Sequence, residues 1–207
     1  MDRVMTDLTF PLLSISRLRM GIDGRGVTTL VAGAGCPLRC KYCINQVLLR
    51  MPAQPVTLQE LYERVKIDDL YFQATSGGVT FGGGESLLHS DFIAAFSALC
   101  ANKWRISIET SLAVPRKQVA TAARVADEFI VDIKESNEGI YCAYTGGKAE
   151  MAWGNLQYLL ETVDAERIRV RVPLIPAYNT PEDCARTVER LQTLGLSRIE
   201  RFSYIIK

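Results

Sequence analysis

The stretch VTTLVAGAGCPLRCKYC, residues 27–43, joins an apolar run to three closely spaced cysteines. Residues 27–35 are rich in β-branched and apolar side chains and end in glycines, which predicts a buried strand leading directly into the cysteine loop. The cysteines are Cys36, Cys40 and Cys43, in the spacing C-x3-C-x2-C. The sequence therefore places its most reactive side chains at the end of a predicted strand.

The alternation of strand and helix continues from this loop to the end of the chain. We predict further strands at residues 77–81, 105–110, 128–134, 167–175 and 198–206. We predict helices at residues 56–65, 90–102, 115–126 and 152–163, and another that begins at Pro181. Six strands that alternate with helices, without a low-complexity linker, are typical of parallel βα units.

The length of the chain limits how many such units it can form. Its 207 residues fall short of the roughly 250 that are typical of a closed eight-unit barrel. We therefore expect an α/β fold with a partial, open (βα)6 TIM-like barrel, and a flat doubly wound sheet is the alternative. We expect one domain over residues 1–207, with residues 1–21 as an N-terminal extension and residues 22–207 as the barrel.

The composition gives the chain no strong overall charge. It has 24 Lys and Arg against 23 Asp and Glu, so no net field attracts nucleic acid or an anionic membrane. No apolar run approaches the roughly 20 residues of a membrane span, and the start, MDRVMTDLTF, lacks the apolar core of a signal peptide. The 6 cysteines are not spaced as a disulfide framework. We expect a cytoplasmic protein with reduced thiols and with no nucleic-acid or membrane partner.

The unusual motifs follow the predicted strands. GGGE, residues 82–85, follows the second strand, ETS, residues 109–111, the third, and DIK, residues 132–134, the fourth. Ligands of parallel α/β folds bind at the carboxyl ends of the strands. One face of the fold should therefore gather thiols, a glycine platform, carboxylates and a lysine.

Three kinds of structure could use three cysteines at this spacing. Offsets of four and seven fit one face of a buried helix that begins at Pro37. Structural zinc needs four ligands, usually in two close pairs, and no second C-x2-C pair occurs in the chain. A [4Fe–4S] cluster normally takes four thiolates, so three leave one iron open to a substrate or cofactor. Arg39 and Lys41 between the cysteines favour the cluster over a buried helix face.

The motif C-x3-C-x-aromatic-C, filled by Cys36, Cys40, Tyr42 and Cys43, resembles the signature of the radical S-adenosylmethionine (radical SAM) superfamily. Residues 22–46, 77–93, 131–134 and 169–184 are similar, in order and spacing, to glycyl-radical-enzyme activating enzymes of the pyruvate formate-lyase activating type. The resemblance implies a partial (βα)6 barrel, a [4Fe–4S] cluster on the three cysteines, and reductive cleavage of S-adenosylmethionine to a 5′-deoxyadenosyl radical. It also implies a partner glycyl radical enzyme and a flavodoxin or ferredoxin-type electron donor.

The resemblance further implies which residues contact S-adenosylmethionine. These are Tyr42 in the cysteine motif, Gly83, Gly84 and Glu85 in a G-G-E motif, the acidic-Thr pair Glu109 and Thr110, Asp132 and Lys134 in an aspartate-x-lysine triplet, and Arg171 on a strand. The G-G-E motif would receive the methionine amino group, and the lysine is a point charge suited to the carboxylate.

Each of these motifs also has a purely structural alternative. The glycines could form only a tight turn, Asp132 and Lys134 only a rim ion pair, and Arg171 one member of an exposed alternation. Two positions depart from the family pattern, because Gly82 stands where serine is usual and Ser86 where proline or alanine is. The single histidine, His89, is expected at the surface near a helix start.

Two other functions remain open from the sequence. One is radical SAM modification of a small molecule or peptide, and the other, of a different class, is a noncatalytic iron-sulfur redox-sensing module. The ferredoxin-like insert of many activating enzymes is absent after Cys43, and Tyr204 is followed by Ile205 where close relatives continue with Tyr-His. We therefore expect a wide barrel mouth that admits a loop of another protein.

Overall fold

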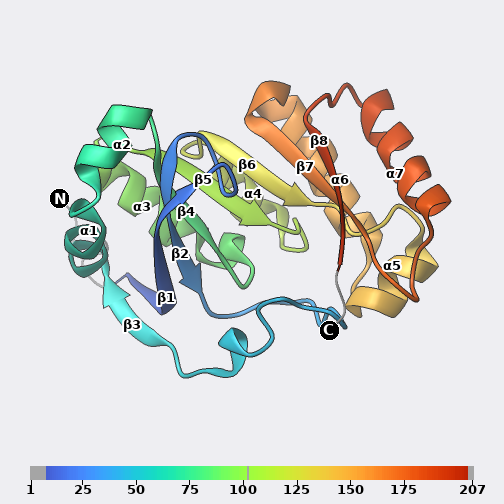
Figure 1. The fold of residues 1–207 in the computed structure, drawn as a ribbon, viewed down its shortest axis with the longest axis horizontal. Coiled ribbons are helices and arrows are strands. Elements are labelled where there is room, and N and C mark those ends of the chain that lie inside the picture. The colour runs from blue at the N-terminus through green and yellow to red at the C-terminus, as the bar shows by residue number, and fades with distance from the viewer. Residues whose placement is uncertain (1–7, 102, 205–207) are drawn as a thin grey trace.

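The computed structural model describes residues 8–101 and 103–204, and its centre is an eight-stranded sheet (Figure 1). Across the sheet the strands stand in the order β3-β1-β2-β4-β5-β6-β7-β8. Their bounds are β1 Thr9–Met20, β2 Val27–Gly33, β3 Gln54–Thr57, β4 Gly78–Gly83, β5 Arg105–Thr110, β6 Glu128–Asp132, β7 Ile168–Leu174 and β8 Ile199–Ser203. The α-helices are α1 Leu58–Lys66, α2 Asp69–Thr75, α3 Ser90–Cys100, α4 Arg116–Ala123, α5 Glu138–Thr145, α6 Ala149–Thr162 and α7 Pro181–Thr193, with short 3-10 helices η2 Leu48–Arg50, η3 Ser86–His89 and η4 Ala165–Arg167.

The six predicted strands are β2, β4, β5, β6, β7 and β8, and they run parallel in chain order. Because right-handed crossovers between strands in this order all turn the same way, the helices cover one face of the sheet. A doubly wound sheet would instead reverse its strand order partway. Within the described residues β3 and β8 each pair on one side only, so the barrel is open. The predicted partial (βα)6 barrel is confirmed.

Two strands were not expected from the sequence. β1 lies in the predicted N-terminal extension, yet it pairs antiparallel with β2 and is part of the same sheet. β3 pairs antiparallel with β1, and only its last two residues, 56 and 57, fall within the helix expected over 56–65. The helix begins at Leu58, because the Thr57 hydroxyl accepts a hydrogen bond from Glu60 N and the Glu60 carboxylate accepts one from Thr57 N.

The two faces of the parallel strands differ in polarity. Side chains alternate along a strand, so neighbours such as Val79 and Thr80 point to opposite faces. The face toward the helices joins the buried core, which includes Val79, Phe81, Ile106, Ile108, Phe129, Val131, Val170 and Val172. The opposite face carries Thr80, Ser107, Glu109, Asp132, Arg169 and Arg171. The inside of the open barrel is therefore polar, unlike the packed interior of a closed one.

The turn between β1 and β2, residues 21–26, closes over part of this polar face. Thr80 Oγ1 donates a hydrogen bond to Asp23 O, and an Arg171 nitrogen donates to Ile22 O at 2.7 Å. Gly24 adopts φ +128°, and a Cβ there would lie 2.8 Å from Ser107 Oγ. The turn thus fills the barrel beside the middle of the strands and leaves their carboxyl ends open. No helix in residues 8–101 and 103–204 is long and apolar enough to cross a membrane.

Candidate active site

A cavity of about 110 Å³ lies at the carboxyl ends of the parallel strands. It is lined by most of the residues that the sequence singled out, namely Cys36, Cys40, Cys43, Gly83, Gly84, Glu85, Glu109, Thr110, Asp132 and Lys134. These residues come from four segments, each at the end of a different strand. The structure therefore brings together the motifs that the βα pattern placed on one face.

The cysteine loop is held by its backbone. Arg39 N donates to Thr145 O at 2.8 Å and Lys41 N to Tyr144 O at 3.1 Å, which fixes the loop against the end of α5. Residues 34–43 form no helix, so the alternative of a buried helix face is wrong. Within the described residues, no three His, Cys, Asp or Glu side chains surround a point that a single metal ion could occupy.

The Cys40 thiol shares the cavity with the Lys134 ammonium. Burial raises the pKa of the half-buried Cys40 thiol, and the ammonium of Lys134 opposes that rise. A bound metal would supply the positive charge that holds such a thiol as a thiolate.

Close backbone contact joins the glycine motif to the cysteine loop. Gly84 N donates to Gly33 O at 2.9 Å, and Glu85 N donates to Gly35 O at 2.8 Å. A Cβ on Gly84 would lie 2.1 Å from Gly35 O, and Gly83 adopts φ +91°. These glycines therefore do more than form a turn, because only a bare backbone allows the two loops to approach this closely.

Glu85 is buried, and both oxygens of its carboxylate are hydrogen-bonded within the protein. Oε1 accepts from Thr110 Oγ1 at 2.6 Å and from Leu87 N at 3.2 Å. Oε2 accepts from Ser111 N at 2.8 Å and from Ser111 Oγ at 2.6 Å. The side chain thus ties the end of β4 to the end of β5. A direct contact between this carboxylate and a cofactor stays a prediction.

Asp132 and Lys134 form an ion pair at the edge of the cavity. The Lys134 ammonium donates to Asp132 Oδ2 at 2.8 Å, and its side chain is only 9% exposed. Burial lowers the pKa of Lys134, but Asp132, Tyr204 and Cys40 together raise it well above the ordinary value. Asp132 Oδ1 is buried and has no hydrogen-bond partner among the described residues. The pair therefore offers a fixed cation and a free acceptor to a ligand.

Arg171 and Tyr42 do not line the cavity. Arg171 instead donates to Glu109 Oε1 at 2.8 Å, and Glu109 lines the cavity. Burial raises the pKa of Glu109, and Arg171 opposes that rise. The Tyr42 ring packs edge-on against Tyr178, with centroids 5.9 Å apart. Arg171 thus holds a residue of the wall from outside the cavity, whereas Tyr42 contacts other aromatic rings.

Several residues of the site were not predicted from the sequence. Asn45, Ser111 and Tyr204 line the cavity, and Asn45 Nδ2 donates to Gly83 O at 2.6 Å. Only their position in the sequence could have identified them, because each follows a motif or the end of a strand. His89 is half-buried rather than at the surface, and its Nε2 lies 2.8 Å from Ala34 O, just before the cysteine loop.

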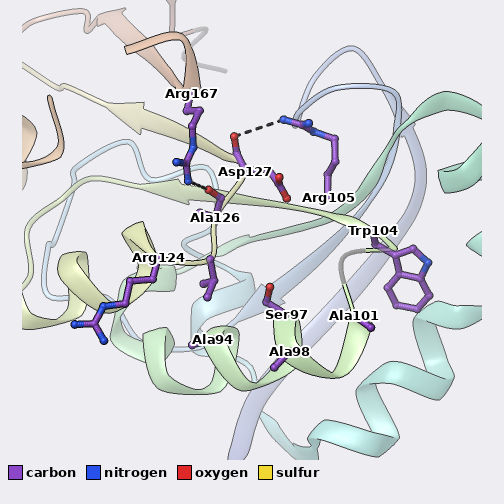
Figure 2. Close-up of a pocket in the computed structure, with 11 residues that line it drawn as sticks. Ala94, Ser97, Ala98, Ala101, Trp104, Arg105, Arg124, Ala126, Asp127 and Arg167 are labelled. Carbon is purple, nitrogen blue, oxygen red and sulfur yellow. Dashed lines mark hydrogen bonds between the residues drawn. The ribbon is translucent and has the colours of Figure 1, made fainter. Parts of the chain in front are cut away.

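A larger pocket of about 630 Å³ lies at the opposite end of the strands (Figure 2). The small side chains of Ala94 and Ala98 on α3 line part of it. Figure 2 shows Arg105 and Arg167 hydrogen-bonded to the backbone oxygens of Asp127 and Ala126. These residues are at the amino ends of strands, where α/β folds do not place their active sites.

Comparison with known protein families and relatives agrees with this geometry. The family described as the radical SAM superfamily matches residues 30–191. The choline trimethylamine-lyase activating enzyme of Oleidesulfovibrio alaskensis is 28% identical over an alignment that covers 79% of this chain and 72% of the relative. The (2S)-3-sulfopropanediol dehydratase activating enzyme of Klebsiella oxytoca is 32% identical over 63% of this chain and 41% of the relative. The pyruvate formate-lyase-activating enzyme of Clostridium pasteurianum is 25% identical over 88% of this chain and 82% of the relative.

Solved structures show the same fold at low identity. Streptococcus suis SuiB aligns with a TM-score of 0.65 and 15% identity, over 86% of this chain and 40% of that protein. QueE from Escherichia coli aligns with a TM-score of 0.52 and 14% identity, over 93% of both chains. The family match covers most of the chain and includes the cysteine loop. The chain therefore belongs to the radical SAM superfamily, whose members are enzymes that use a [4Fe–4S] cluster and S-adenosylmethionine.

Proposed function

We propose that this enzyme activates a glycyl radical enzyme by abstracting a hydrogen atom from one of its glycines. The observation that carries the proposal is that activating enzymes for several different lyases and dehydratases recur among its relatives. The open end of the partial barrel supports it, because a loop of another protein has to enter there. The chain covers 41% to 82% of these relatives, so the identity of the partner is not fixed by them.

We assign Cys36, Cys40 and Cys43 as the ligands of the cluster. The three thiols line one cavity, and the other cysteines of the described chain do not line it. Three ligands leave one iron for the cofactor. When bound, the cluster supplies one electron that cleaves S-adenosylmethionine into methionine and a 5′-deoxyadenosyl radical.

We assign the contacts of the methionine portion to the ends of β4 and β6. The Lys134 ammonium is placed to pair with the carboxylate of methionine, as a buried cation on the cavity wall. Asp132 Oδ1 has no hydrogen-bond partner among the described residues and is a suitable acceptor for the amino group. Gly83 and Gly84 line the same wall, where Gly83 O already accepts a hydrogen bond from Asn45 Nδ2. Glu109 and Thr110 complete the wall on the β5 side.

In the proposed reaction, the 5′-deoxyadenosyl radical takes one hydrogen atom from the glycine α-carbon. The products are 5′-deoxyadenosine and a glycyl radical in the partner. A flavodoxin or ferredoxin-type protein would supply the electron. These partners and the oxygen-sensitive cluster fit a reducing compartment, and we place the enzyme in the cytoplasm.

Isotope transfer combined with electron paramagnetic resonance tests the proposal. The reduced, cluster-loaded enzyme is incubated anaerobically with S-adenosylmethionine and a glycyl radical enzyme encoded nearby, whose glycines carry deuterium. We expect a persistent glycyl doublet and deuterium in the 5′-deoxyadenosine.

Other outcomes would assign the enzyme elsewhere. If no such protein gains the signal, and a metabolite or peptide extract donates the hydrogen, the enzyme modifies a small molecule or peptide. If the reduced cluster never cleaves S-adenosylmethionine, the protein is a noncatalytic iron-sulfur module.

A further inference from the structure

Residues 37–51, here called the rim segment, expose large apolar side chains. Ile44 is 88% exposed, Val47 77% and Met51 54%. In Figure 1 the rim segment runs along the lower edge of the molecule, from the end of β2 to β3. Exposed apolar side chains grouped in this way mark a surface that binds another molecule.

The rim segment is also basic. Arg39, Lys41 and Arg50 are exposed, and none of them forms an ion pair with any residue that the structure describes. The sequence has no Asp or Glu between Asp23 and Glu60. Because the whole chain has a net charge of only +1, this positive charge is a local feature. An acidic protein would meet it with complementary potential.

The inner side of the rim segment is a wall of the active-site cavity. Leu38 and Leu49 line the cavity together with the three cysteines. A protein bound to the outer side would therefore lie directly beside the proposed cluster site. Electron transfer between two proteins requires such a short separation.

We propose that the rim segment is the docking surface for a small acidic redox protein of the flavodoxin or ferredoxin type. This inference rests on the proposed function. The donor loses one electron, the cluster gains it, and no proton or other atom is exchanged. A short apolar centre with a basic border fits complexes of redox proteins, which bury less than about 1,200 Å² and depend on charge for fast association.

The charge of the rim segment favours the redox donor over the glycyl radical enzyme. The glycine of that enzyme has to enter the cavity, so its interface must surround the strand ends. Side chains of both signs occur there, including Glu109, Asp132 and Lys134. The rim segment has only one sign of charge, which suits a partner that has to recognise the outer surface alone.

Charge reversal at the surface tests the proposal. The variant R39E/K41E/R50E is compared with K103E/K117E/R124E, which reverses three exposed basic residues elsewhere and changes the net charge equally. Binding of an acidic flavodoxin to the cluster-loaded enzyme is followed by flavin fluorescence anisotropy at several salt concentrations, and cluster reduction by absorbance. We expect the rim variant to associate about 10-fold to 100-fold more slowly at low salt, and the control to retain the rate of the native protein.

Chemical reduction separates docking from chemistry. With dithionite as the reductant, the clusters of both variants should be reduced, and both should cleave S-adenosylmethionine as the native enzyme does. If neither the variants nor the native enzyme cleave it, the proposed function is overturned instead. A second variant, V47D/R50E, lies outside the cysteine motif and is used if the first loads less iron. Equal flavodoxin binding by rim and control variants overturns the docking proposal. It is also overturned if only activation of the glycyl radical enzyme falls, because the surface then belongs to that partner.

Discussion

Glu85 is buried and accepts hydrogen bonds from four donors. Each oxygen has two of them, from Thr110 and Leu87 on one side and from Ser111 on the other. A glutamine has one oxygen and one NH2 group, so its NH2 must face at least one N–H donor. We expect Glu85→Gln to lower the free energy of unfolding by about 1–3 kcal/mol, measured by urea titration of the metal-free protein. Glu63→Gln on exposed α1 is the control, and equal stability of the two variants would contradict this role.

Gly82 leaves room for the side chain of Glu109 on the neighbouring strand. A Cβ at Gly82 would lie 2.5 Å from Glu109 Oε2 and 2.7 Å from Leu30 Cδ1. Glu109 cannot move away freely, because Arg171 holds its other oxygen. We expect Gly82→Ala to cost about 1–3 kcal/mol of stability. In a double-mutant cycle, the loss of stability in Gly82→Ala/Glu109→Asp should be at least about 0.5 kcal/mol smaller than the sum of the losses in the two single variants. Strict additivity would show that the two side chains do not compete for the same space.

The cysteines of the loop differ from the other cysteines in what surrounds them. Cys36, Cys40 and Cys43 line the cavity, whereas Cys100 and Cys184 are buried in the apolar core. Replacing any one of the first three by Ala should remove most of the iron from anaerobically reconstituted protein, measured by iron analysis and absorbance. The controls are Cys100→Ala and Cys184→Ala. If iron follows the controls instead of the loop, the ligand assignment is wrong.

Helix α7 begins with a reciprocal hydrogen-bonded cap. Thr180 Oγ1 accepts from Asp183 N at 3.2 Å, and the Asp183 carboxylate accepts from Thr180 N at 2.8 Å. Hydrogen bonds from Thr180 lower the pKa of Asp183 below its ordinary value of 3.8. The charged carboxylate therefore stabilises the fold above about pH 4, and this contribution is lost as the pH falls through the lowered pKa.

Replacing this carboxylate should thus have an effect that depends on pH. We expect Asp183→Asn to cost about 1 kcal/mol at pH 7 and progressively less below about pH 4, measured by urea unfolding at both ends of that range. Glu182→Gln, in the same first turn but exposed, should cost less at pH 7. A cost for Asp183→Asn that is the same at every pH would exclude the linkage.

The elements that the sequence predicted well are those with a strong local pattern. β2, β4, β5, β6 and β7 are short runs of apolar and β-branched residues, and turns or helix starts bound them. β1 was missed because it contains Pro11 and pairs through two register irregularities. β3 has four residues, one of which is Pro55, too few to form a pattern. The local sequence determines where the parallel strands end, whereas β1 and β3 form only because they pair with other strands of the sheet.

The site results from how separate βα units are joined. The chain order of the motifs predicted which residues line the cavity, because every parallel strand ends on the same face. Chain order could not show that Arg171 acts through Glu109, since that contact joins residues 62 positions apart. It also could not show that the turn at residues 21–26 occupies the barrel, where Arg171 bonds to Ile22 O. Such roles depend on the curvature of the sheet, which no single segment encodes.

Because the cofactor site joins several strand ends, S-adenosylmethionine should stabilise the whole fold of the cluster-loaded enzyme. At 100 times its dissociation constant, a ligand that binds only the folded state adds about 2.7 kcal/mol. We expect a higher melting temperature with S-adenosylmethionine and a much smaller rise for Lys134→Met at the same concentration. Loss of a charge-assisted hydrogen bond of about 1.5–3 kcal/mol corresponds to about 10-fold to more than 100-fold weaker binding.

Two further variants test whether the effect of Lys134 is specific to the cavity. Lys117→Met removes a lysine from exposed α4 and should retain the full rise in melting temperature. Arg171→Met should have an intermediate effect, because it leaves the cavity wall in place but releases Glu109. If Lys134→Met has a normal iron content and shows the same rise as the native enzyme, the cofactor does not bind at the end of β6. The cavity would then have to bind it through the ends of β4 and β5 alone.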